Sequence, residues 1–254
     1  MLGVKAWWRR RALRDPGFTA EQWAAAVRSV GLLEEWPAAA LARLREQAVF
    51  FLRAKRFAAA GGGEISDELR LLIAVQACVP ILHLDIDYYT GWREVIVYPD
   101  TFVTRHQEMD EAGVVHSWRQ VSAGEAWTRG PLILSRADVE ESAPQRDGYN
   151  VVIHEMAHKL DMLNGDANGF PPLHREMRVQ DWAQAWSAAY HAFCEQVDRD
   201  DAVILDPYGA EDPAEFFAVM TEAFFETPAV VAECFPSLYP QLAGFYRYDP
   251  RWTV

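Results

Sequence analysis

Three observations in the amino-acid sequence predict an α+β fold. Apolar residues recur every three to four positions over 37–57, which is the period of an amphipathic helix. The period changes in the middle third, where short runs such as 94–98 consist mainly of valine, isoleucine and tyrosine. The helical period returns from 150. The sequence therefore predicts a helical N-terminal part, a small mixed β-sheet and a helical C-terminal part.

The length and composition favour one domain. The chain has 254 residues, 50% of them hydrophobic, and no low-complexity linker divides it. A chain of this size can bury a full core without disulfides or other cross-links. We therefore expect a single domain over 1–254, in which 1–90 form the helical N-terminal part and 91–254 form the functional core.

Three helices are expected in the N-terminal part. Residues 19–22 read Thr-Ala-Glu-Gln and have the form of a capping box, and Gly31 is typical of a helix end. The second helix is expected over 37–57. Ser66 can cap a third helix, which runs to Pro80.

The middle third contains the predicted strands. The run 94–98 is strand-like and ends at Pro99, and 114–121 is a second candidate. A third candidate covers 131–135, and its leading proline suits a strand start or the edge of a sheet. We expect this third strand to be the edge at which an extended peptide could pair.

Helices are expected again in the C-terminal part. They cover 150–163, 175–198, 213–226 and a short aromatic-rich stretch, 236–247. The first of these carries the pattern on which the functional interpretation depends.

Charge and hydropathy exclude two classes of partner. The formal net charge of −13 argues against direct binding of nucleic acid, because phosphate contacts need a basic surface. The longest apolar run, 71–84, is too short and too mixed to span a bilayer. One basic cluster near the N-terminus could contact a membrane surface or a partner, but a solvated segment is the favoured interpretation. Its residues are Lys5, Arg9, Arg10, Arg11 and Arg14.

The three cysteines indicate a reducing compartment. Cys78, Cys194 and Cys234 are widely spaced, form no Cys-x-x-Cys motif and lie among apolar neighbours. We expect three buried free thiols in a cytoplasmic protein.

The segment from His154 to His158 reads His-Glu-Met-Ala-His. Two histidines four positions apart project from one face of a helix, one turn apart, and can share a zinc ion. Glu155 lies one position further round, where it can reach a metal-bound water without binding the metal. That is the place of a general base in a metallopeptidase.

A catalytic zinc site needs a third protein ligand and one open position. The extended metzincin motif would require glycine at Asp161 and histidine at Asn164, so that class is excluded. A downstream glutamate is the natural alternative. The candidates are Glu215, which spacing favours, then Glu222, with His174 and His191 as further possibilities.

Glu215 has a competing structural interpretation. Asp212, Pro213 and Glu215 occupy the N-cap, first and third positions of the helix 213–226. They could form an Asp-type capping box, which would use the carboxylate locally. The sequence spacing leaves both roles open.

The sequence resembles the Mlc titration factor A family of bacterial zinc metallopeptidases. The resemblance is carried by 91–99, 130–135, 147–161 and 206–215, which include Gly-Trp-Arg-Glu-Val-Ile-Val-Tyr-Pro and Asp-Pro-Ala-Glu. It covers 91–254, the expected catalytic core, better than the N-terminal third. It implies a gluzincin with a zincin-type active-site helix, similar to the catalytic domain of anthrax lethal factor.

The resemblance also assigns residues. It implies that His154, His158 and Glu215 hold one Zn²⁺ per chain, that Glu155 is the general base and that Tyr208 lies in the active site. Tyr208 would then stabilise the oxyanion together with the zinc. Asp161 shares the face of the two histidines, and its carboxylate could accept the distal N–H of one of them. The alternatives for Asp161 are a favourable place at the helix end or a position facing solvent.

The functional expectation follows from both lines of argument. We expect a zinc-dependent peptidase that acts on peptide substrates, and the resemblance implies aminopeptidase-like activity. It also implies a partner, the transcriptional repressor Mlc. The alternative function is therefore a regulatory protein that sequesters such a repressor, with peptidase activity secondary.

Overall fold

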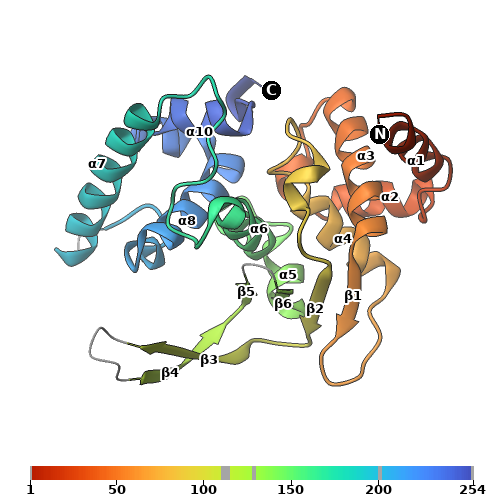
Figure 1. The fold of residues 1–254 in the computed structure, drawn as a ribbon, viewed down its shortest axis with the longest axis horizontal. Coiled ribbons are helices and arrows are strands. Elements are labelled where there is room, and N and C mark those ends of the chain that lie inside the picture. The colour runs from red at the N-terminus through yellow and green to blue at the C-terminus, as the bar shows by residue number, and fades with distance from the viewer. Residues whose placement is uncertain (1, 110–114, 128–129, 200–201, 253–254) are drawn as a thin grey trace.

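A computed structural model describes residues 2–109, 115–127, 130–199 and 202–252, and it has the predicted α+β fold. Helix α6 (Val151–Asp161) lies near the centre of the molecule (Figure 1). The N-terminal helices lie on one side of it, and the C-terminal helices α7, α8 and α10 lie on the other (Figure 1). The main sheet lies beside α6.

The N-terminal helices begin where the sequence predicts caps. The Thr19 side chain accepts from the backbone N–H of Gln22, whose side chain accepts from the Thr19 backbone, so the capping box is confirmed. Ser66 accepts from the N–H of Leu69 and starts the next capped helix. The helices are α1 (Leu2–Arg14), α2 (Ala20–Arg28), α3 (Ala38–Ala54) and α4 (Asp67–Ala77).

The basic N-terminal segment forms α1, in which Arg10, Arg11 and Arg14 are exposed, as expected of a solvated segment, while Ala12 is buried against Val49 and Phe50. One expectation for this part is wrong. The helix expected over 37–57 ends at Ala54, and strand β1 (Arg56–Ala59) follows it. Pairing with a strand distant in the sequence overrides the local helical pattern.

The main sheet has the strand order β1-β2-β6-β5. Strands β1, β2 (Glu94–Tyr98) and β6 (Leu132–Ser135) are parallel, and β5 (Gly124–Ala126) pairs antiparallel with β6. The expectation that 131–135 form the edge is therefore wrong, since β6 has a partner on each side. The edge next to α6 is the short strand β5.

A separate antiparallel hairpin extends from the body of the molecule (Figure 1). It consists of β3 (Phe102–Met109) and β4 (Val115–Ser122), paired from 102 with 122 to 109 with 115. The expected strand 114–121 corresponds to β4, and its first residue lies outside the described part. Strand β3 has no counterpart among the strands predicted from the sequence.

The C-terminal helices follow the predicted pattern, and α8 has the predicted bounds, while the other three predicted helices are shorter than expected. The expected helices 150–163, 175–198, 213–226 and 236–247 correspond in that order to α6, α7, α8 and α10. Their observed bounds, with the unpredicted α5 and α9, are α5 (Arg136–Ser142), α6 (Val151–Asp161), α7 (Val179–Asp198), α8 (Pro213–Glu226), α9 (Pro228–Cys234) and α10 (Tyr239–Tyr246).

One cluster of buried hydrophobic residues runs from Ala26 in α2 to Tyr246 in α10 and includes the apolar face of α6. The assignment of 1–254 to a single domain remains a prediction. The three cysteines are free, but only Cys78 is buried, while Cys194 is half-buried and Cys234 is exposed. The expectation of three buried thiols is therefore wrong, because apolar sequence neighbours do not decide which face of a helix a side chain occupies. Among the helices described, none has the length and apolar composition of a membrane span.

Candidate metal centre

Helix α6 supplies two imidazoles to the site. The side chain of Asn150 caps the helix by accepting from the backbone N–H of Ile153 at 3.1 Å. The face opposite the metal side is packed in the core, which fixes the rotation of the helix. His154 and His158 therefore project together, with ring centroids 4.9 Å apart.

Helix α8 supplies a carboxylate from its first turn. The side chain of Asp212 accepts from the backbone N–H groups of Ala214 and Glu215, at 2.7 and 2.9 Å. The Glu215 carboxylate does not return to the cap, because it contacts the two histidines. The cap and the contact with the histidines thus use different parts of Glu215, so the two roles considered from sequence do not compete.

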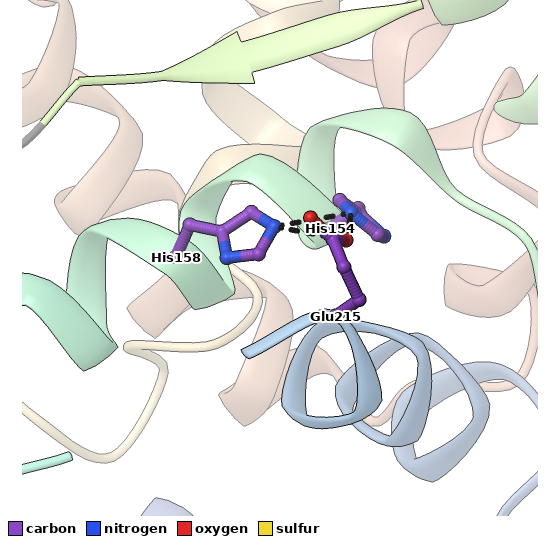
Figure 2. Close-up of side chains that lie close together, drawn as sticks. All are labelled: His154, His158 and Glu215. Carbon is purple, nitrogen blue, oxygen red and sulfur yellow. Dashed lines mark hydrogen bonds and ion pairs between the residues drawn. The ribbon is translucent and has the colours of Figure 1, made fainter. Parts of the chain in front are cut away.

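Three potential ligand atoms meet between the two helices (Figure 2). Oε2 of Glu215 lies 3.0 Å from Nε2 of His154 and 3.3 Å from Nε2 of His158. The two Nε2 atoms are 3.2 Å apart. Ligand atoms at roughly 2.0–2.2 Å from a tetrahedral ion lie about 3.3–3.6 Å from one another, so the triangle is only slightly tighter than a zinc ion requires.

The donor types agree with this geometry. Two imidazole nitrogens and one carboxylate oxygen suit zinc, whereas magnesium and calcium prefer all-oxygen sites. His154, His158 and Glu215 form a group of potential metal ligands, and the described part of the chain contains no other such group. The arrangement can therefore hold a divalent transition metal.

The electrostatics of the three groups are coupled. Burial by itself would raise the pKa of Glu215, but hydrogen bonds from His154 and His158 outweigh it and hold this pKa far below its usual value. Burial would lower the pKa of His154, but the charge of Glu222 and hydrogen bonds to Glu215 and Glu222 raise it. A metal ion can bind His154 only through an unprotonated ring nitrogen. Metal binding therefore competes with protonation of His154.

Glu155 lies against the edge strand β5. Its side chain is 4% exposed, and Oε2 has no hydrogen-bond partner among the described residues. Burial raises its pKa to about 7, against the opposing charges of the two histidines. A Cβ atom at Gly124 would lie only 2.5 Å from Oε1 of Glu155, so β5 and this carboxylate are in direct contact.

Tyr208 lies beside the site. It belongs to the short 3-10 helix η4 (Pro207–Ala210), whose N-cap Asp206 accepts from the Tyr208 backbone N–H. The ring centroid of Tyr208 is 6.1 Å from that of His154. The phenol is thus placed next to the potential ligands, although it is seven positions before Glu215 in the sequence.

The carboxylate of Asp161 is fully buried at the end of α6. Its Oδ2 accepts from the backbone N–H groups of Asn168 and Gly169, at 2.6 and 2.7 Å. Oδ1 of Asp161 and Nδ1 of His158 are both buried and have no hydrogen-bond partner within the described part. Support of a histidine by Asp161 therefore stays a prediction, but the solvent-facing alternative is wrong.

The other candidate ligands lie outside the triangle of potential ligand atoms. Oε1 of Glu222 contacts Nδ1 of His154 at 2.7 Å, on the side away from the triangle. Both ring nitrogens of His174 are engaged, with the hydroxyl of Tyr88 and the carbonyl of Phe245. His191 is exposed on α7, outside this group. No signal in the sequence points to Gly124, since a lone glycine in a strand does not indicate what it packs against.

Comparison with known proteins agrees with this site. Residues 4–247 match the family model described as glucose-regulated metallo-peptidase M90. Mlc titration factor A of Salmonella gallinarum is 41% identical over 227 residues, which cover 87% of this chain and 84% of that protein. The protein of the same name from Salmonella arizonae is 40% identical and is covered to 89%. The chain therefore belongs to the glucose-regulated metallo-peptidase M90 family, a family of metallopeptidases.

Proposed function

We propose that this protein is a zinc-dependent peptidase with aminopeptidase-like activity, in which His154, His158 and Glu215 hold the metal. The observation that carries the proposal is the triangle of potential ligand atoms, with edges of 3.0, 3.2 and 3.3 Å. The triangle lies beside Glu155, whose buried Oε2 has no hydrogen-bond partner among the described residues. A zinc ion bound there would supply a Lewis acid that lowers the pKa of its water towards about 7 and polarises the scissile carbonyl.

Glu155 is the proposed general base. Its carboxylate has a free oxygen within the described structure, and a pKa of about 7 suits a group that must take up and release a proton near neutral pH. It would accept the proton of the attacking water and deliver it to the leaving amine. The Tyr208 hydroxyl would donate a hydrogen bond to the carbonyl oxygen as negative charge develops there.

The edge strand β5 is the proposed place for the substrate backbone. It has one partner, β6, among the described strands, and its Gly124 lies against Glu155. An extended peptide that pairs with the open edge of β5 would pass close to the base.

Elemental analysis and one substitution test this proposal. The purified protein should contain one zinc per chain and should hydrolyse aminoacyl p-nitroanilides, but not their N-acetylated forms. Glu155→Gln keeps the shape and most hydrogen bonding but removes the basicity, so hydrolysis should fall by about 10²- to 10⁴-fold. Zinc content and melting temperature should change little. Normal turnover in Glu155→Gln, or a wild-type protein that takes up no zinc, would contradict the proposal.

A second function is supported by the relatives, which are called Mlc titration factor A. We propose that this chain also binds a transcriptional repressor of the Mlc type. Surface plasmon resonance with immobilised Mlc would test this, with wild type and Glu155→Gln compared. Equal binding by both would separate the regulatory role from catalysis, and no binding by either would remove the second function.

A further inference from the structure

Glu222 is a buried carboxylate on α8 that contacts the back of the metal centre. It is 1% exposed, and both of its oxygens lie at hydrogen-bond distance from α6 or its cap. Oε1 lies 2.7 Å from Nδ1 of His154, and Oε2 accepts from the backbone N–H of Asn150 at 2.5 Å. Each oxygen therefore contacts a different group, one the imidazole and the other the backbone of the helix cap.

The first contact selects one form of the imidazole. A neutral histidine carries a proton on only one ring nitrogen, and an ionised carboxylate can only accept. Glu222 therefore favours the tautomer in which Nδ1 is protonated. The lone pair of His154 is then on Nε2, the nitrogen that lies 3.0 Å from the Glu215 carboxylate and 3.2 Å from Nε2 of His158.

The second contact places the helix that carries this histidine. Asn150 is the N-cap of α6, and its own Oδ1 accepts from the N–H of Ile153. Glu222 thus contacts the N-cap residue of the helix and the imidazole one turn later with a single carboxylate. The position and the rotation of His154 are set together.

A neighbouring carboxylate provides a comparison. Glu226 is one turn further along α8 and 2% exposed. It accepts from the Asn150 side chain at 3.2 Å and from the Gly148 backbone at 3.1 Å. No contact between Glu226 and His154 is found in the described structure, so Glu226 supports the same cap without touching the imidazole.

We propose that Glu222 is a positioning residue of the metal centre, which fixes the tautomer and orientation of His154 for metal binding through Nε2. The inference rests on the proposed role of His154 as a zinc ligand. His158 differs in this respect, because its Nδ1 is buried without a hydrogen-bond partner among the described residues. Any effect of Glu222 should therefore be specific to His154.

The substitution Glu222→Gln tests the proposal. A glutamine has one accepting oxygen and one donating nitrogen, so it cannot accept from both His154 and Asn150, and one N–H must face another donor. We expect zinc affinity, measured by competition with a chromophoric chelator, to fall by about 10- to 100-fold. Glu226→Gln is the matched control, and its zinc affinity should stay within about twofold of wild type.

Nuclear magnetic resonance of the zinc-loaded protein gives a second readout that needs no activity. In protein labelled with ¹⁵N-histidine, long-range proton–nitrogen correlations identify the protonated nitrogen of each ring. His154 should show a protonated Nδ1 whose proton exchanges slowly with water in wild type and in Glu226→Gln. In Glu222→Gln this proton should exchange much faster, while the signals of His158 stay in place.

Several results would overturn the inference. They are a wild-type His154 protonated at Nε2, unchanged zinc affinity in Glu222→Gln, or an equal loss of affinity in both variants, which would reduce Glu222 to a helix support. A wild-type His154 protonated at Nε2 would overturn the inference even if Glu222→Gln does not fold. Zinc binding of the expected pattern without peptide hydrolysis would remove the proposed function and leave this inference standing.

Discussion

Glu215 contributes both to the start of a helix and to the candidate metal centre. Its backbone N–H is held by Asp212, while its carboxylate reaches the two histidines. The hydrogen bonds from the histidines keep this buried carboxylate ionised, against the effect of burial. The role of the helix cap and the role of the Glu215 carboxylate can therefore be tested by separate substitutions.

Glu215→Gln should remove most bound zinc and most activity. Glutamine keeps the size of the side chain and can replace glutamate at this helix position, so the helix cap should survive. The loss of charge weakens the bond to a divalent cation. Zinc per chain, measured by plasma mass spectrometry after dialysis, checks this expectation. Full retention of zinc would remove Glu215 from the set of ligands.

Asp212→Ala is the converse substitution. It removes the acceptor for two backbone N–H groups and should lower the free energy of unfolding by about 1 kcal/mol. Zinc content should stay at one per chain, because Asp212 lies outside the group of potential ligands. Chemical denaturation and metal analysis of the same sample measure both effects. A stable variant without zinc would show that the cap and the ligand are not independent.

At the scale of elements, the site lies where two helices and an edge strand meet. Helix α6 carries the histidines and Glu155, α8 carries Glu215, and β5 closes the side next to Glu155. The close approach of β5 requires that residue 124 has no side chain. A Cβ atom there would lie 2.5–2.7 Å from three atoms of Glu155.

Gly124→Ala should therefore displace Glu155 or push β5 away from it. We expect turnover to fall by about 100-fold, because small misplacements of a catalytic group have effects of this size. Zinc content should be unchanged, since the atoms nearest the new Cβ belong to Glu155 and not to a potential ligand. Gly63→Ala is the control, because a Cβ there would meet only Ala59, at an ordinary 3.7 Å. Equal activity of the two variants would show that the contact does not position Glu155.

At the scale of the whole molecule, polar and aromatic contacts join the N-terminal part to α6. The Asn150 side chain donates to Gln76 of α4 as well as to Glu226 of α8, at 2.9 and 3.2 Å. The ring of Trp92 contacts two lysine ammonium groups, with Lys55 at 3.3 Å and Lys159 of α6 at 4.9 Å from its centroid. The placement of α6 thus depends on residues from the N-terminal part and from the C-terminal helix α8.

Glu226 makes the stability of this arrangement depend on pH. Burial raises its pKa from 4.5 to about 8, although hydrogen bonds from Asn150 and Gly148 oppose the shift. Between these two values the folded protein holds a proton that the unfolded chain releases. The contribution of the protonated Glu226 carboxyl group to the free energy of unfolding is therefore complete below pH 4.5. It is lost as the pH rises through about 8.

Glu226→Gln should remove this dependence, because glutamine does not titrate. The free energy of unfolding of wild type relative to the variant should fall by on the order of 1–3 kcal/mol between about pH 5 and about pH 8. Urea denaturation of both proteins at several pH values across this range measures the difference. The other titrating groups are common to both proteins and largely cancel. A difference that is constant with pH would mean that Glu226 does not change its ionisation on folding in this range.

The sequence alone determined the features that depend on neighbours along the chain. Spacing of four placed His154 and His158 on one face, and the local cap at Asp212 and Pro213 located the start of α8. These signals are readable because a helix satisfies its own hydrogen bonds within a few residues. The family resemblance then selected Glu215, which spacing could only favour.

Only the tertiary structure decided what depends on distant segments. The short strands β1 and β5 have little periodicity of their own, and they exist because β2 and β6 pair with them. Glu222 looked like a rival ligand from its place on the helix. Its role as a contact of Nδ1 emerges only when α8 is packed against α6, 68 positions away. Which atom of a side chain faces a site is set by packing, and packing is a property of the whole fold.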